Sequence, residues 1–143
     1  MELWKPFADT FQADALTLFR TDHWTVIVRK SQVTLGTLVL AANRNFISAA
    51  ELTRDELLEF PRVVGRLEGA LSRAFAFDKI NYLCLMMSDR HYHFHVIPRY
   101  EEPRRFEGKE WRDEDWPGPP NIAVPPTEEP TLIAIRDHLR QYV

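Results

Sequence analysis

Residues 91–100 read HYHFHVIPRY, with a histidine at every second position of the first half. The three histidines are His91, His93 and His95. Because successive side chains of a β-strand point to opposite faces of a sheet, these three share one face and lie roughly 6.6 Å apart. The other face carries the apolar side chains of Tyr92, Phe94 and Val96. The chain has only five histidines, so three in register favour a functional site over a chance cluster on the solvent-facing side of a sheet.

Four further strands are predicted before this one, over residues 15–21, 23–30, 34–42 and 80–87, with a turn near Asp22. They are rich in apolar and β-branched residues and are separated by turn residues or by a helix. Gly36 introduces the third strand. Because the connection after residue 87 is short, the histidine strand is expected to return antiparallel beside strand 80–87.

One long helix is predicted over residues 52–77. Thr53 and Glu56 form a capping-box pattern at its start. Pro61 lacks an amide donor, which predicts a kink or a tightened first segment. Apolar residues recur at three- and four-residue intervals and define one apolar face. They are Leu57, Phe60, Val64, Leu67, Leu71 and Phe75.

The character of the chain changes after residue 100. Residues 101–130 are charged and proline-rich, and we expect an extended arm that Trp111 and Trp116 anchor to the body. A short helix is predicted over residues 131–142, with His138 exposed on it. The expected architecture is a single domain over residues 1–143, with a core at about residues 16–100. Its fold class is α+β, an antiparallel sheet of about five strands with one long helix packed on it, plus the arm and the short helix.

Composition excludes several classes of partner. The net charge of −3 gives no basic field for a nucleic-acid polymer. No apolar run is long enough to span a membrane, and the N-terminus lacks the pattern of a signal peptide. Cys84 is the only cysteine, so no intrachain disulfide is expected, and we interpret it as a small core residue. A reducing, cytoplasmic location fits this usage.

The alternating histidines permit two chemistries. Two histidines at i and i+2 of a strand can ligate zinc, but such a site needs further ligands, and only His23 and His138 remain, with Asp89 the nearest carboxylate in the sequence. The alternative is nucleophilic catalysis at phosphorus. Neutral imidazole is a good nucleophile near pH 7, and flanking imidazoles can donate hydrogen bonds to phosphate oxygens.

The stretch HYHFHVIPR resembles the signature of the histidine triad superfamily, in which three histidines alternate with apolar residues. Residues 35–56, LGTLVLAANRNFISAAELTRDE, are similar to the upstream segment of that family. The resemblance covers roughly residues 16–100. It implies a nucleotide hydrolase or transferase that acts on the α-phosphate of nucleotide conjugates, and a homodimer.

The resemblance also implies roles for individual residues. His93 would be the nucleophile that forms a transient nucleotidyl-histidine, His95 would stabilise charge on the phosphate, and His91 would orient the site and support the leaving group. Contacts to the nucleotide or its phosphates would come from Arg29, Thr37, Arg99 and Ser88. No metal and no cofactor are implied.

Several positions depart from the family pattern. Thr37 follows Gly36 where many members have histidine, and Asn45 stands where another histidine is common. Arg29 occupies a position that often supplies an acid or amide to the ribose. The loop before the triad, which is usually glycine-rich, is shortened here to residues 87–90 and offers fewer backbone donors.

The favoured function is therefore hydrolysis or transfer at the α-phosphate of a nucleoside conjugate, such as a dinucleoside polyphosphate or a nucleoside phosphoramidate. One alternative is a non-catalytic nucleotide-binding dimer or scaffold. A further alternative is a metal-dependent hydrolase that uses the histidine strand. The expected partners are a small-molecule nucleotide and a second copy of the chain, with no nucleic-acid polymer and no membrane.

Overall fold

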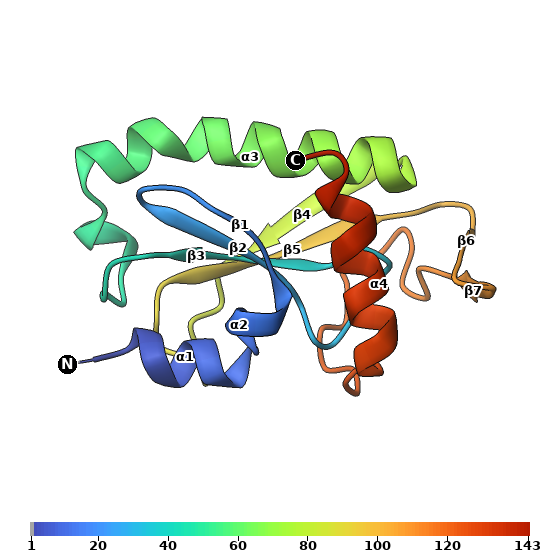
Figure 1. Cartoon of the computed structure of the whole chain (residues 1–143), viewed down its shortest axis with the longest axis horizontal. Coiled ribbons are helices and arrows are strands. Elements are labelled where there is room, and N and C mark those ends of the chain that lie inside the picture. Colours follow the sequence, from blue (N-terminus) through green and yellow to red (C-terminus); the bar gives the residue numbers. More distant parts are fainter. Residues whose placement is uncertain (1) are drawn as a thin grey trace.

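The computed structural model describes residues 2–143 and contains a five-stranded antiparallel sheet in the order β1-β2-β3-β5-β4. This confirms the predicted fold class (Figure 1). The strands are β1 (Thr17–Arg20), β2 (Trp24–Val28), β3 (Leu38–Ala42), β4 (Lys79–Leu83) and β5 (His93–Arg99). The histidine strand lies inside the sheet, between β3 and β4, so neighbours on both sides fix its register.

Strand pairing follows the apolar pattern. All residues of β2 and β3 are buried, and β5 pairs with β3 so that Phe94 lies opposite Leu40. The predicted antiparallel return of β5 beside β4 is confirmed. Gly36 precedes β3 with φ of +90°, and a Cβ atom there would lie 2.9 Å from Leu71. The turn into β3 therefore requires glycine for both its backbone conformation and its close contact with a helix.

The long helix α3 (Arg54–Phe75) lies across one face of the sheet (Figure 1). It begins with the predicted capping box, in which Thr53 and Glu56 exchange hydrogen bonds. The predicted apolar face was wrong at its first position, since Leu57 is exposed. Glu56 turns inward instead, where its carboxylate pairs with Arg44, and Leu57 on the next helical position consequently points outward. No helix within residues 2–143 is long and apolar enough to cross a membrane.

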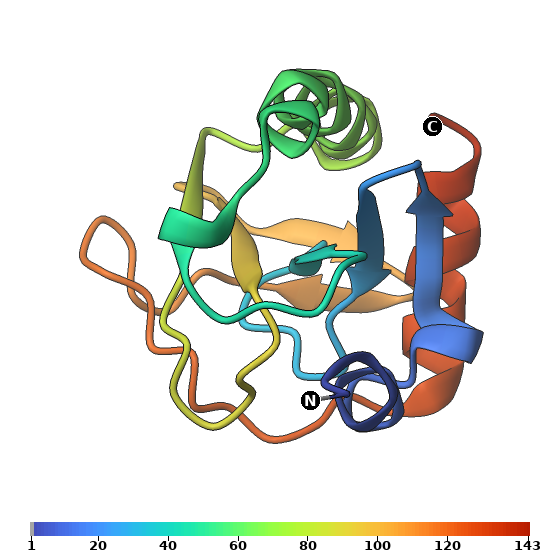
Figure 2. The same ribbon diagram turned by 90° about the vertical axis from the view of Figure 1, so that its left-hand side faces the viewer.

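Two short helices, α1 (Trp4–Thr10) and α2 (Ala13–Leu16), precede the sheet. Neither helix was expected from the sequence. Figure 2 shows α1 on the opposite side of the sheet from α3, so the histidine face is covered as well. The three histidines are therefore buried and do not face solvent.

The arm after β5 forms a small hairpin, β6 (Arg104–Phe106) with β7 (Lys109–Trp111), and then runs without regular structure to α4 (Glu129–Arg140). Trp111 and Trp116 are half-buried, and Trp111 packs against the core. Figure 2 shows α4 beside β1. One side of this helix is buried, through Leu132, Ile135 and Leu139.

Two local expectations were wrong. His138 is half-buried rather than exposed, because its ring packs against Phe75 and Phe106 with centroids 5.5 and 5.4 Å away. Cys84 is exposed rather than in the core. It lies directly after the last residue of β4, an edge strand, where no further element within residues 2–143 covers it.

Candidate active site

The three histidines lie together on the face of the sheet that α1 covers. His93 and His95 belong to β5, and His91 lies just before this strand. Their exposed fractions are 1% for His91, 2% for His93 and 7% for His95. The period-two pattern therefore brings them to one face as predicted, but in a largely desolvated setting.

Aromatic residues of the N-terminal segment enclose the imidazoles. The ring of Phe7 lies 5.0 Å from that of His91 and 5.0 Å from that of His93, measured between centroids. Phe11, which follows α1, lies 5.8 Å from His93 and 6.4 Å from His95. The sequence signal for this cover is the recurrence of Trp4, Phe7 and Phe11 at three- and four-residue spacing.

Hydrogen bonds to the backbone fix the tautomer of two of these rings. Nδ1 of His93 lies 2.6 Å from the carbonyl oxygen of His91. A carbonyl oxygen only accepts, so Nδ1 carries the proton and Nε2 keeps the free lone pair. Nε2 of His91 donates in the same way to the carbonyl oxygen of Ala42. The middle histidine is therefore held with one nitrogen protonated and the other available.

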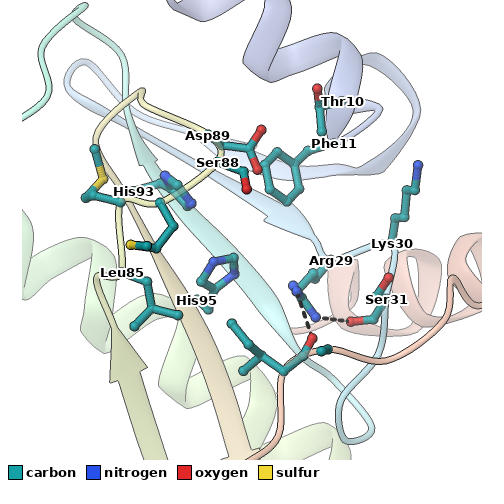
Figure 3. A pocket seen from close by; sticks show the side chains of 14 residues that line it. Thr10, Phe11, Arg29, Lys30, Ser31, Leu85, Ser88, Asp89, His93 and His95 are labelled. Carbon is teal, nitrogen blue, oxygen red and sulfur yellow. Dashed lines mark hydrogen bonds between the residues drawn. The ribbon is translucent and has the colours of Figure 1, made fainter.

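A cavity of about 360 Å³ lies over His93 and His95. Figure 3 shows how four parts of the chain meet there: Phe11 after α1, the segment from Arg29 after β2, the β4–β5 loop with Ser88 and Asp89, and the arm. The arm contributes Ile122 and Ala123 to the wall. Neither the cover by Phe11 nor the wall from the arm was expected from the sequence.

The three imidazoles are kept neutral. Burial lowers the pKa of His91, of His93 and of His95, in the last case to about 3. The pKa of His95 is lowered further by the positive charge that His93 would carry if it were protonated, and by the guanidinium of Arg29. Arg29 acts on His93 in the same direction, while Asp89 and the carbonyl of His91 oppose it. A neutral His93 is the form that can act as a nucleophile.

Arg29 lines the cavity beside His95 (Figure 3). Its terminal nitrogens donate to the carbonyl oxygens of Ser31 at 2.8 Å and Ile122 at 3.2 Å. Its Nε is buried and has no hydrogen-bond partner within residues 2–143. The predicted site residue Ser88 also lines this cavity.

Two other predicted site residues lie away from the cavity. The hydroxyl of Thr37 donates to the carbonyl of Thr34, and this buried pair shapes the turn before β3. Arg99 is buried in an ion pair with Asp113, 2.7 Å between Nε and the carboxylate. That guanidinium also donates to Asn81 and to the carbonyl of Gly118. Arg99 therefore fastens the arm to the sheet instead of facing the histidines, so the expectation that it adds charge to the site was wrong.

Asn45, another position that departs from the family pattern, has a structural partner. Asn45 is exposed, and its side-chain oxygen accepts from the backbone N–H of Trp4 at 3.0 Å, at the start of α1.

Within the described residues 2–143, no group of three or more His, Cys, Asp or Glu side chains is arranged to hold a metal ion.

Neither the models of known families nor the curated proteins include a match to this chain. Solved structures do match it. A histidine triad protein from Sinorhizobium meliloti is 19% identical with a TM-score of 0.73, and the match covers 94% of each chain. A hypothetical histidine triad nucleotide-binding protein from Sulfolobus tokodaii is 18% identical with a TM-score of 0.70, covering 94% of this chain and 87% of that one.

A zinc-bound histidine triad family protein from Mycobacterium smegmatis is 16% identical with a TM-score of 0.60, and the match covers 95% of this chain and 93% of that one. The chain thus has the fold of the histidine triad proteins. At these identities the likeness shows the fold alone.

Proposed function

We propose that this chain belongs to the histidine triad superfamily and catalyses hydrolysis or nucleotidyl transfer at the α-phosphate of a nucleoside conjugate. The observation that carries the proposal is the hydrogen bond from Nδ1 of His93 to the carbonyl oxygen of His91. It leaves Nε2 of a neutral imidazole as the nucleophile, on a side chain that lines a cavity of about 360 Å³.

In the first step Nε2 of His93 attacks the α-phosphorus. A P–N bond forms, and the bond between phosphorus and the leaving group breaks, with its electron pair departing on the leaving group. A phosphate leaves as an anion, whereas an amine also takes up a proton from solvent. The ring of the resulting nucleotidyl-histidine is positively charged, and the carbonyl of His91 stabilises it by accepting the bond from Nδ1–H.

In the second step water, or the acceptor of a transfer, attacks the same phosphorus. The P–N bond breaks, Nε2 recovers its lone pair, and the proton lost by the attacking hydroxyl passes to solvent. Nδ1 stays protonated throughout, so the ring returns to its starting tautomer without rearrangement.

The neighbouring groups act on the phosphate. His95 is neutral because its pKa lies at about 3, so it donates one hydrogen bond to a phosphate oxygen and brings no charge. Ser88 lines the same cavity and donates to a phosphate oxygen as well, and Arg29 adds positive charge to the wall of this nucleotide site. His91 orients the site, because its backbone carbonyl fixes the ring of His93. We propose no phosphate contact for Thr37.

Steady-state hydrolysis of a panel of dinucleoside polyphosphates and nucleoside phosphoramidates tests the proposal. His93→Ala should lower turnover by several orders of magnitude, because it removes the nucleophile. His95→Ala should lower it by about 10²–10³, the typical loss for one charge-stabilising donor. Arg73→Gln, on the exposed surface of α3, is the control. Near-native turnover by His93→Ala would contradict the assignment.

The burial of all three imidazoles favours a second candidate, a nucleotide-binding protein without turnover. It predicts that the unmodified protein binds nucleoside monophosphates, hydrolyses nothing in the panel, and binds equally well after His93→Ala. A metal-dependent hydrolase would instead contain stoichiometric metal and lose activity to a chelator. Assays with and without a strong chelator separate these outcomes.

The resemblance further implies a homodimer, and we propose that β4 forms the interface. It is the outer strand of the sheet on one side, with half-buried Ile80, Tyr82 and Leu83. On the other side, α4 packs beside β1. An uncovered edge strand offers unpaired backbone groups to a second copy of the chain.

A further inference from the structure

One wall of the cavity carries positive charge that no protein group neutralises at close range. Arg29 and Lys30 both line it. Within residues 2–143 neither side chain has a carboxylate within ion-pairing distance. The chain as a whole has a net charge of −3, so this positive wall is a local feature of the cavity.

Arg29 is held in place with hydrogen-bonding capacity to spare. The carbonyls of Ser31 and Ile122 occupy one N–H on each terminal nitrogen. The second N–H on each of these nitrogens is left over, and so is Nε–H, which is buried without a partner. A buried unsatisfied donor is destabilising, and an anion satisfies several such donors of a guanidinium at once.

Seen from His93, the wall lies beyond His95. Figure 3 shows His95 between His93 and Arg29, with Lys30 beyond Arg29. Asp89, the only carboxylate lining the cavity in the described chain, lies across from Arg29, near Ser88. A phosphate bound at His93 and His95 therefore leaves part of the cationic wall open to a further group of the same ligand.

We infer that Arg29 and Lys30 bind a second phosphate group of the substrate, so that the site selects conjugates with two phosphate groups over those with one. The inference rests on the proposed function for the position of the first phosphate. The second phosphate has two sources: the next phosphate of a polyphosphate chain, or a phosphate on the ribose. Both present the same oxygens to the guanidinium.

Calorimetric binding at constant ionic strength tests this without turnover. The probes are nucleoside 5′-monophosphates, their α,β-methylene diphosphates, which resist hydrolysis, and their 3′,5′-bisphosphates, each in adenosine and guanosine series. In the unmodified protein the favoured two-phosphate ligand should bind about 10- to 100-fold more tightly than the monophosphate, the range expected for hydrogen bonds to a charged group. Whether the diphosphate or the bisphosphate shows this gain identifies the source.

Arg29→Gln should abolish most of this gain, and Lys30→Gln should reduce it less, since Lys30 is a single mobile charge. Arg29→Lys should keep part of it. Arg73→Gln, with equal loss of charge on the other face of the sheet, should leave it unchanged. Melting temperatures show whether each variant is folded. If Arg29→Gln does not fold, Lys30→Gln and Arg29→Lys test whether the gain in affinity depends on this wall.

The inference is overturned if mono- and two-phosphate ligands bind equally, if none binds, or if the gain survives in the folded Arg29 and Lys30 variants. It is separable from the proposed function. An Arg29-dependent gain in a protein that hydrolyses nothing would remove the enzymatic proposal alone. Hydrolysis without such a gain would remove this inference alone.

Discussion

His93 donates a hydrogen bond through Nδ1 to the backbone carbonyl of His91, two residues earlier in the chain, at 2.6 Å. A contact within one short segment thus sets the tautomer of the central imidazole. It requires no charged residue, in contrast to sites in which a carboxylate orients the catalytic histidine. The availability of Nε2 is therefore coupled to the backbone conformation at the start of β5.

A covalent intermediate should form on His93. Mixing the protein with a reactive conjugate and quenching within the first turnover should give a protein whose mass has increased by one nucleotidyl group. The adduct should be acid-labile, since P–N bonds to imidazole hydrolyse in acid, and it should be absent from His93→Ala. An adduct that maps to another residue would contradict the assignment.

Activity should persist to lower pH than an ordinary histidine allows. Burial holds the pKa of His93 below its usual value of 6.5, so the neutral nucleophile stays populated as the pH falls through 6.5. The rate constant kcat/KM should therefore be level across this range and fall only at more acidic pH. Arg29→Gln removes a nearby positive charge, and it should shift this acid limb towards neutral pH.

The decrease of kcat/KM at acidic pH can come from protonation of His93 or from unfolding of the protein, and the two causes must be separated. In the unfolded chain His93 and His95 titrate near 6.5, whereas their pKa values in the folded chain are lower. The unfolded state thus binds more protons below pH 6.5, and the free energy of unfolding should decrease as the pH falls through this window. Urea unfolding at each pH gives the fraction of folded protein, and kcat/KM is corrected for this fraction.

Phe7→Ala should destabilise the protein and open the site. Phe7 is buried against the rings of His91 and His93, and truncation of a buried phenylalanine costs about 3 kcal/mol or more. Water admitted under α1 should raise the pKa of His93, which an NMR titration of the imidazole protons measures. Pro6→Ala, exposed on the same helix, should change neither quantity appreciably.

Asp113→Asn should loosen the arm. Asp113 and Arg99 form an ion pair whose side chains are 2% and 5% exposed, respectively, and leaving one such charge unpaired costs about 3–5 kcal/mol. Burial raises the pKa of Asp113, but its bonds from Arg99 and the backbone lower it more. Because the arm supplies Ile122 and Ala123 to the cavity, KM should rise more than kcat falls.

The control for that variant is Arg112→Gln, which breaks the exposed pair with Glu110. Exposed pairs contribute about 0–1 kcal/mol, so stability and KM should stay close to those of the unmodified protein. Equal effects of the two substitutions would show that the Arg99–Asp113 pair does not hold the cavity wall.

Light scattering at micromolar concentration should give the mass of a dimer. Tyr82→Arg would place a charge on β4, the edge strand of the proposed interface, and should yield monomers. Leu57→Arg, at an exposed position in the first turn of α3, tests whether that helix takes part. A monomeric mass for the unmodified chain would contradict the dimer.

Local patterns in the sequence were enough for the sheet, the long helix and the histidine face. Alternation with period two places His93 and His95 on one side of β5 whatever surrounds them, and the bond between Thr53 and Glu56 forms within one turn of helix. These features depend on neighbours a few residues apart, so they can be read along the chain.

Contacts between distant segments decided the rest. Phe7 reaches the histidines across more than eighty residues of sequence, Arg29 donates to Ile122 in the arm, and Arg99 turns to Asp113 instead of the cavity. No local spacing encodes such partners, because an arginine at the end of a strand can bind a substrate or a carboxylate equally well. The sequence by itself therefore determined which atoms can do chemistry, whereas only the tertiary structure decided that these atoms are desolvated and which cation faces them, since burial and charge pairing depend on the whole packed chain.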